Sequence, residues 1–128
     1  MKLILDTHTY LWAINEAEQL SAKAQEAIGD PANELFLSVA SLWEATIKIT
    51  IGKLHVPGNH VDFLIAQLAS TGVQILPISP SHLRHLQTLP LHHRDPFDRV
   101  LIAQSEVEQM PIVTTDRDIN LYPVKTIW

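Results

Sequence analysis

The 128-residue sequence contains no cysteine. Disulfide bonds and metal sites built on thiolates are therefore excluded, and only oxygen and histidine ligands remain for a metal ion. Long apolar runs are missing as well. The run that begins at Leu3 is interrupted at Asp6, too early for the apolar region of a signal peptide. No stretch approaches the roughly 20 apolar residues that span a bilayer. We therefore expect a soluble, cytoplasmic protein that does not enter a membrane.

Charged residues are also scarce, at 18%, whereas 46% of the residues are hydrophobic. This balance is typical of a globular protein, and the length is close to that of one common domain. Because no linker or repeat divides the chain, we predict a single domain over residues 1–128. The net charge of −5 disfavours binding of nucleic acid through a basic face. That argument weakens if bound cations neutralise several acids, so the charge leaves both interpretations open.

Short apolar segments alternate with segments of helical periodicity along the chain. The predicted strands are 2–6, 34–38, 73–78, 110–115 and 124–128. The predicted helices are 7–14, 22–28, 41–51, 61–70, 81–89 and 96–108. Strands that alternate with helices in this way predict an α/β fold with a mostly parallel central sheet.

Four acids occupy related positions in this pattern. Asp6 and Asp116 follow predicted strands, and Glu44 and Asp98 fall in the first turns of predicted helices. In open parallel sheets, functional crevices lie at the carboxyl ends of the strands. We therefore expect these four side chains, which are far apart in the sequence, to converge at one edge of the sheet.

Each acid also has a purely structural interpretation. Asp6 fits a helix cap, Asp116 fits a solvated turn, and residues 41–44 match a capping box of the form S-x-x-E. Asp95 and Asp98 fit the N-cap and the first turn of a helix that begins with proline. Taken singly, these structural roles are the better interpretation. Only the joint placement of the four acids favours a common site.

Ionised carboxylates that gather at one site repel one another unless some bind protons or a cation lies between them. Ligation by oxygen alone favours Mg²⁺, Mn²⁺ or Ca²⁺ over zinc. Mg²⁺ held by a few carboxylates is the usual arrangement for work on phosphates, and a pair of such ions can cleave a phosphodiester. The sequence therefore predicts metal-assisted hydrolysis.

Other polar and aromatic residues are harder to assign. No H-E-x-x-H zinc motif occurs, and most histidines are expected at the surface, with His8 the one expected to line the site. Trp12 and Trp43 fit a core or an interface better than the stacking of nucleobases. Arginines that flank the acids would either bind substrate phosphates or pair with those acids: Arg94, Arg99 and Arg117.

Four blocks of sequence, in this order and spacing, resemble a PIN domain of the VapC type, the toxins of prokaryotic toxin–antitoxin systems. The blocks are LILDTHTYLW (3–12), SVASLWEATIKITIGKL (38–54), HRDPFDRVLIAQS (93–105) and IVTTDRDI (112–119). The resemblance covers nearly the whole chain. A single block would be weak support, whereas the four together are specific.

The resemblance implies a three-layer α/β/α fold and an endoribonuclease that depends on Mg²⁺ or Mn²⁺. It assigns the four acids of the family to Asp6, Glu44, Asp98 and Asp116, as catalytic residues and metal ligands, with Asp95 in support. It also implies an RNA substrate, an antitoxin protein that blocks the site, and a homodimer. The alternative is a catalytically weak module of the same fold that acts mainly by binding a protein partner.

Overall fold

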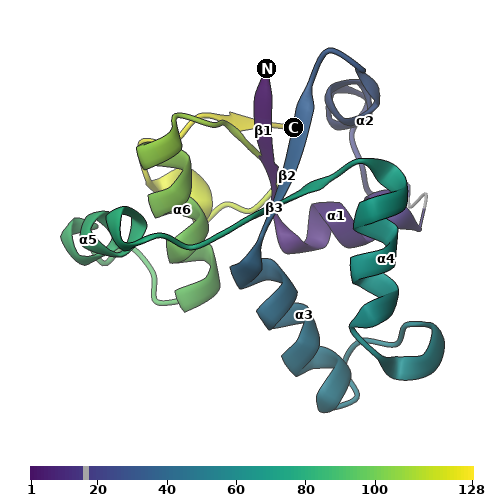
Figure 1. Cartoon of the computed structure of the whole chain (residues 1–128). Helices are drawn as coiled ribbons and strands as arrows, with labels where there is room; N and C mark the ends of the chain where they lie inside the picture. The colour runs from purple at the N-terminus through teal and green to yellow at the C-terminus, as the bar shows by residue number, and fades with distance from the viewer. Residues whose placement is uncertain (16–17) are drawn as a thin grey trace.

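The computed structural model describes residues 1–15 and 18–128. One sheet of parallel strands is covered by helices on both faces (Figure 1). The strands are β1 (Lys2–Leu5), β2 (Glu34–Ser38), β3 (Gln74–Leu76), β4 (Ile112–Val113) and β5 (Thr126–Ile127). The helices are α1 (Thr7–Ile14), α2 (Ala22–Gly29), α3 (Val39–Thr50), α4 (Asp62–Thr71), α5 (Pro80–Thr88) and α6 (Pro96–Glu108). The predicted α/β class is confirmed, and the predicted elements differ from these bounds by at most two residues.

The strand order is β3-β2-β1-β4-β5, and each neighbouring pair is parallel. The first strand therefore lies at the centre, with Leu5 opposite Leu37 on one side and opposite Val113 on the other. The chain adds β2 and β3 to one side of β1 and later adds β4 and β5 to the other side. The direction of winding thus reverses between β1 and β4.

Two separate cores result from the alternation of side chains along β1. Leu3 and Leu5 point to the face covered by α1, α2 and α4, whereas Ile4 points to the face covered by α5 and α6. None of the three is more than 1% exposed. Each such side chain contributes about 1.5–3 kcal/mol to stability when it is buried. Because β1 is apolar on both faces, it can only be a central strand of a layered fold.

Helix α3 leaves the carboxyl end of β2 without a loop and packs against α1 and α6 (Figure 1). Its N-cap is Ser38, whose hydroxyl oxygen accepts a hydrogen bond from the Ala40 backbone N–H (3.1 Å). The predicted capping box at residues 41–44 is therefore wrong. Ser41 lies inside the helix, buried, and its hydroxyl has no partner among the described residues. The S-x-x-E pattern misplaced the start of α3, because β2 runs directly into this helix and the N-cap lies one turn earlier, at Ser38.

Among residues 1–15 and 18–128, no helix has both the length and the apolar character needed to cross a membrane.

Candidate active site

The carboxyl ends of β1 and β4 meet where the winding of the sheet reverses. Ligands of open α/β sheets bind in the crevice that forms at such a point. Asp6 follows β1 directly, and Asp116 stands three residues after the end of β4. The topology therefore brings the first and the last of the predicted acids to the same part of the sheet edge.

Asp6 is buried, with 6% of its surface exposed, and is held from two sides. It is the N-cap of α1, because the Thr9 backbone N–H donates to its Oδ1 atom (2.7 Å). The Thr114 hydroxyl donates to its Oδ2 atom. The same Thr114 oxygen accepts from the backbone N–H of Asp116 (3.0 Å). Thr114 thus joins the acids that follow β1 and β4, and the structural role of Asp6 as a cap coexists with its place in the crevice.

Glu44 lies in the second turn of α3, because the helix begins at Val39 and not at Ser41 as predicted. Its side chain turns back toward α1, where the Thr7 hydroxyl donates to Oε1 (2.7 Å). Lys48, one turn further along α3, pairs with Oε2 (3.2 Å). Glu44 therefore does not cap its own helix, and its contact with Thr7 brings it beside the residue that follows Asp6.

Asp98 occupies the first turn of α6, as predicted. Asp95 caps that helix, and its carboxylate accepts from the backbone N–H groups of Phe97 (2.9 Å) and Asp98 (3.0 Å). Burial, and after it the negative charges nearby, together raise the pKa of Asp98 from 3.8 to about 8. Those charges belong to Asp95, Asp116, Glu44 and Asp6, in decreasing order. The five carboxyl groups, hereafter the acidic cluster, therefore lie near enough to interact.

A partly buried hydrogen-bond network adjoins the acidic cluster and was not predicted from the sequence. Nε2 of His93 lies 3.2 Å from Oδ2 of Asp98, and its Nδ1 lies 2.9 Å from the Tyr122 hydroxyl. Arg99 donates to that hydroxyl oxygen (2.8 Å) and to the backbone carbonyl of Pro90 (2.8 Å). Because Arg99 uses the oxygen as its acceptor, the hydroxyl proton is free to point to Nδ1, which leaves the Nε2 proton facing Asp98. Only the adjacency of His93 and the D-P-F-D segment hinted at this contact.

The structure also places the other polar residues that the sequence singled out. His8 is exposed and lies against Trp12, with ring centroids 5.9 Å apart, whereas His93 contacts Asp98 of the cluster. Most histidines are exposed, as predicted, and His82 is an exception that is buried and pairs with Glu108 on α6. Arg99 binds carbonyl and hydroxyl oxygens, and it does not pair with an acid in the part of the chain that the structure describes.

The family model for the PIN domain matches residues 3–125. The chain belongs to the PIN domain family. No curated protein matches its sequence. One chain in the crystal structure of VapBC2 from Rickettsia felis, bound to a DNA fragment from their promoter, is 16% identical, with a TM-score of 0.75. The match covers 98% of this chain and 97% of that chain.

Two further solved structures have the same fold. A chain of DNA-bound VapBC from Salmonella typhimurium is 14% identical, with a TM-score of 0.74, and the match covers 98% of this PIN domain and 96% of that chain. A chain of FitAcB from Neisseria gonorrhoeae is also 14% identical, with a TM-score of 0.64. There the match covers 97% of this PIN domain and 95% of that chain. At these identities the similarity shows a common fold.

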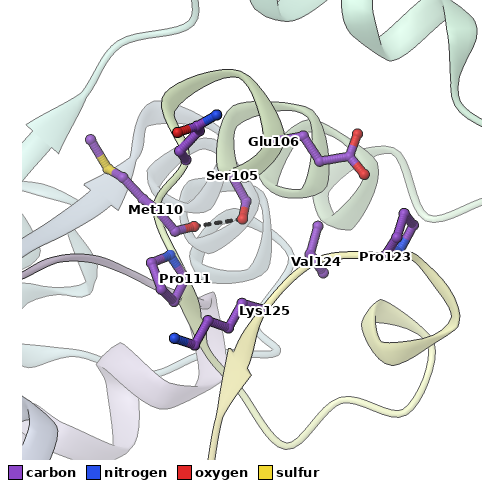
Figure 2. A pocket seen from close by; sticks show the side chains of 8 residues that line it. Ser105, Glu106, Met110, Pro111, Pro123, Val124 and Lys125 are labelled. Carbon is purple, nitrogen blue, oxygen red and sulfur yellow. Dashed lines mark hydrogen bonds between the residues drawn. The ribbon is translucent and has the colours of Figure 1, made fainter.

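A hollow lined by residues such as Ser105, Met110 and Lys125 (Figure 2) contains no member of the acidic cluster in its lining. It measures about 370 Å³ and lies between the end of α6 and the segments that lead into β4 and β5. These are the amino ends of the two strands, at the opposite edge of the sheet from Asp6 and Asp116. Ser105 donates to the Met110 carbonyl, and Glu106 pairs with His85. Two of its polar side chains are thus already engaged within the protein.

The acidic cluster fits a hard divalent cation in its chemistry but is not assembled around one. Oxygen donors and a carboxyl group whose pKa is raised by burial and by its acidic neighbours are what such a cation would stabilise. Across the described residues, no three acidic or histidine side chains already form a set of metal ligands. Instead Asp6, Glu44, Asp98 and Asp116 each make hydrogen bonds to different protein groups. Coordination would exchange part of these hydrogen bonds for contacts with the cation.

Proposed function

We propose that this PIN domain is an endoribonuclease dependent on Mg²⁺ or Mn²⁺ and the VapC-type toxin of a toxin–antitoxin pair. The observation that carries the proposal is the accumulation of negative charge at Asp98, fed by acids from four separate segments of the chain. A fold gains no stability from such repulsion. Groups that oppose folding in this way are typical of functional sites.

In this proposal Asp6, Asp98 and Asp116 hold the cation, Glu44 completes the site, and Asp95 supports it. When bound, the cation lowers the pKa of an attacking water and stabilises the charge that develops on the phosphate. Glu44 orients that water and accepts its proton. The water oxygen forms the new bond to phosphorus as the bond to the 3′ oxygen breaks. The products then carry a 5′-phosphate and a 3′-hydroxyl.

Partners follow from the same proposal. Structures of the same fold include VapBC bound to DNA and a toxin–antitoxin complex from Klebsiella pneumoniae. We infer that this protein binds an antitoxin that blocks the acidic cluster, that it forms a homodimer, and that it works in the cytoplasm, where its RNA substrate lies. The alternative is a catalytically weak PIN-fold module that acts mainly through a protein partner.

Replacement of Asp6 by asparagine tests the proposal. Even residues that only orient metal ligands change metal affinity or activity about 10- to 100-fold, so loss of a ligand should lower cleavage at least about 100-fold. Cleavage of a structured RNA in Mn²⁺ is the measurement, with Asp116→Asn as a second variant. Glu26→Gln is the control, because Glu26 is an exposed acid on α2. Equal cleavage by Asp6→Asn and the control would refute the assignment, and metal-independent cleavage would refute the mechanism.

A further inference from the structure

An apolar hollow of about 220 Å³ lies between α3, α5 and the start of α6, on the side of α3 that faces away from α1. Its apolar walls include Ala40, Trp43, Leu86, Phe97 and Val100. Pockets for drug-sized ligands measure about 300–1,000 Å³, so this hollow suits a single small ring system.

The hollow borders the acidic cluster through three consecutive pairs of residues. Trp43 precedes Glu44, and Phe97 precedes Asp98. Arg94, which also lines the hollow, precedes Asp95. Neighbours on a helix point about 100° apart, so Trp43 and Phe97 each face sideways from the acid that follows them. A group in the hollow would therefore sit next to whatever the acids act on.

Trp43 is held in an open position at the rim of this hollow. Trp43 is 59% exposed, which excludes the core position that the sequence allowed and leaves the interface position open. The Phe97 ring contacts it edge to face, with centroids 5.1 Å apart and planes at 82°. Aromatic pairs of this geometry attract one another, so the indole is braced against one side while the rest of its surface stays accessible.

Positive charge stands beside this aromatic surface in a protein that is otherwise acidic. Two of its four arginines, Arg94 and Arg99, line the hollow. The Arg99 guanidinium donates hydrogen bonds to carbonyl oxygens and to Tyr122, so it forms a fixed part of the lining of the hollow. Arg94 is exposed and makes no salt bridge with any residue that the structure describes. An aromatic surface with an arginine beside it matches an aromatic base with a phosphate attached.

We propose that the hollow binds the base of an unpaired nucleotide next to the phosphodiester that is cut. The base stacks on Trp43, and Arg94 contacts a neighbouring phosphate. A paired base is covered on both faces within its helix, so only a base that is splayed out can offer a face to the indole. This inference rests on the proposed ribonuclease function.

A protein-docking face is the competing interpretation of the same helix. The exposed apolar residues of α3 continue past Trp43 to Ile47 and Ile51, at intervals of one turn. These two isoleucines do not line the hollow, and they lead away from the arginines. The hollow and its charges favour a nucleotide at Trp43, and Ile51 supplies a matched control for the other interpretation.

Binding of a short fluorescein-labelled single-stranded RNA tests the proposal, with an Asp98→Asn background to prevent cleavage. Trp43→Leu should weaken binding about 5- to 150-fold, which is the range for loss of one stacked base. Trp43→Phe should restore most of the binding, and Ile51→Ala should leave it unchanged. Arg94→Gln should lower the slope of log affinity against log salt by about 0.7, and Arg84→Gln, on the exposed face of α5, should not. RNA in a fully paired hairpin stem should bind weakly to every variant.

The outcomes separate this inference from the proposed function. Metal-dependent cleavage with unchanged RNA binding in Trp43→Leu would overturn the inference and leave the ribonuclease intact. Equal losses in Trp43→Leu and Ile51→Ala, with a change in oligomeric state by sedimentation, would replace the base site with a protein-docking face. Absence of both cleavage and RNA binding in the unaltered protein would refute the function and the inference together. Thermal melting of each variant confirms that the change at an exposed residue leaves the fold intact.

Discussion

Replacement of Asp98 by asparagine removes one charge from the acidic cluster and nearly preserves the shape of the side chain. In the metal-free protein, the pKa of Asp98 is raised from 3.8 to about 8, first by burial and then by its acidic neighbours. The folded state therefore binds a proton between about pH 4 and pH 8 that the unfolded chain has released. Stability falls with rising pH wherever the folded state binds more protons, so the unaltered protein loses stability across this interval.

Asparagine cannot ionise, so the Asp98→Asn protein does not lose stability through this group as the pH rises. The difference in unfolding free energy, Asp98→Asn minus unaltered protein, should be near zero at about pH 4 and should grow by about 1.4 kcal/mol per pH unit. It should level off at or below about pH 8, and at a lower pH where solvent screening makes the full shift smaller. The full shift corresponds to at most about 6 kcal/mol. Because 19% of the Asp98 side chain is exposed, solvent screens part of the repulsion, and we expect a plateau of ~2–4 kcal/mol.

Urea denaturation in EDTA across this pH range measures the difference directly. Titrating groups outside the acidic cluster are common to both proteins, so their contributions cancel when the two curves are subtracted. Glu26→Gln serves as the control and should show no pH-dependent difference. If the gap between Asp98→Asn and the unaltered protein stays constant with pH, or shrinks as pH rises, the carboxyl groups do not crowd Asp98 as described.

Three further results are expected. Saturating Mn²⁺, at 100 times its dissociation constant, should stabilise the unaltered protein by about 2.7 kcal/mol, and Asp98→Asn should lose most of this gain in thermal melts. Ser38→Ala should lower stability by about 0.5–2 kcal/mol because it removes the N-cap of α3. Ser41→Ala should be nearly neutral because the Ser41 hydroxyl has no partner among residues 1–15 and 18–128, and the reverse order of the two effects would restore the capping box at residues 41–44. His93→Ala should weaken Mn²⁺ binding about 10- to 100-fold, as measured by calorimetry. His93→Gln should recover part of the Mn²⁺ affinity, because glutamine can still donate a hydrogen bond to Asp98. Equal Mn²⁺ affinities of His93→Ala and the unaltered protein would show that His93 does not position the Asp98 carboxylate.

The sequence by itself determined the class of fold. Apolar strands such as residues 2–5 alternate with periodic helices, and that alternation leaves few arrangements other than helices on both faces of a parallel sheet. It also placed Asp6 and Asp116 at strand ends and Asp98 in a first helical turn capped by Asp95, because caps and strand ends depend on residues close together in the chain. The structure has Asp6 directly after β1 and Asp98 in the first turn of α6, as these local patterns predicted.

Only the tertiary structure decided what distant segments do to one another. The start of α3 depends on how β2 ends against its neighbours, and so the local signal at Ser41 failed. The partnership of His93 with Asp98 and Tyr122, and the exposure of Trp43 beside Phe97, arise where separate elements pack together. The pKa of Asp98 likewise depends on burial and on four charges, three of which come from remote positions in the sequence. Electrostatic and packing energies act through space, so spacing along the chain does not fix them.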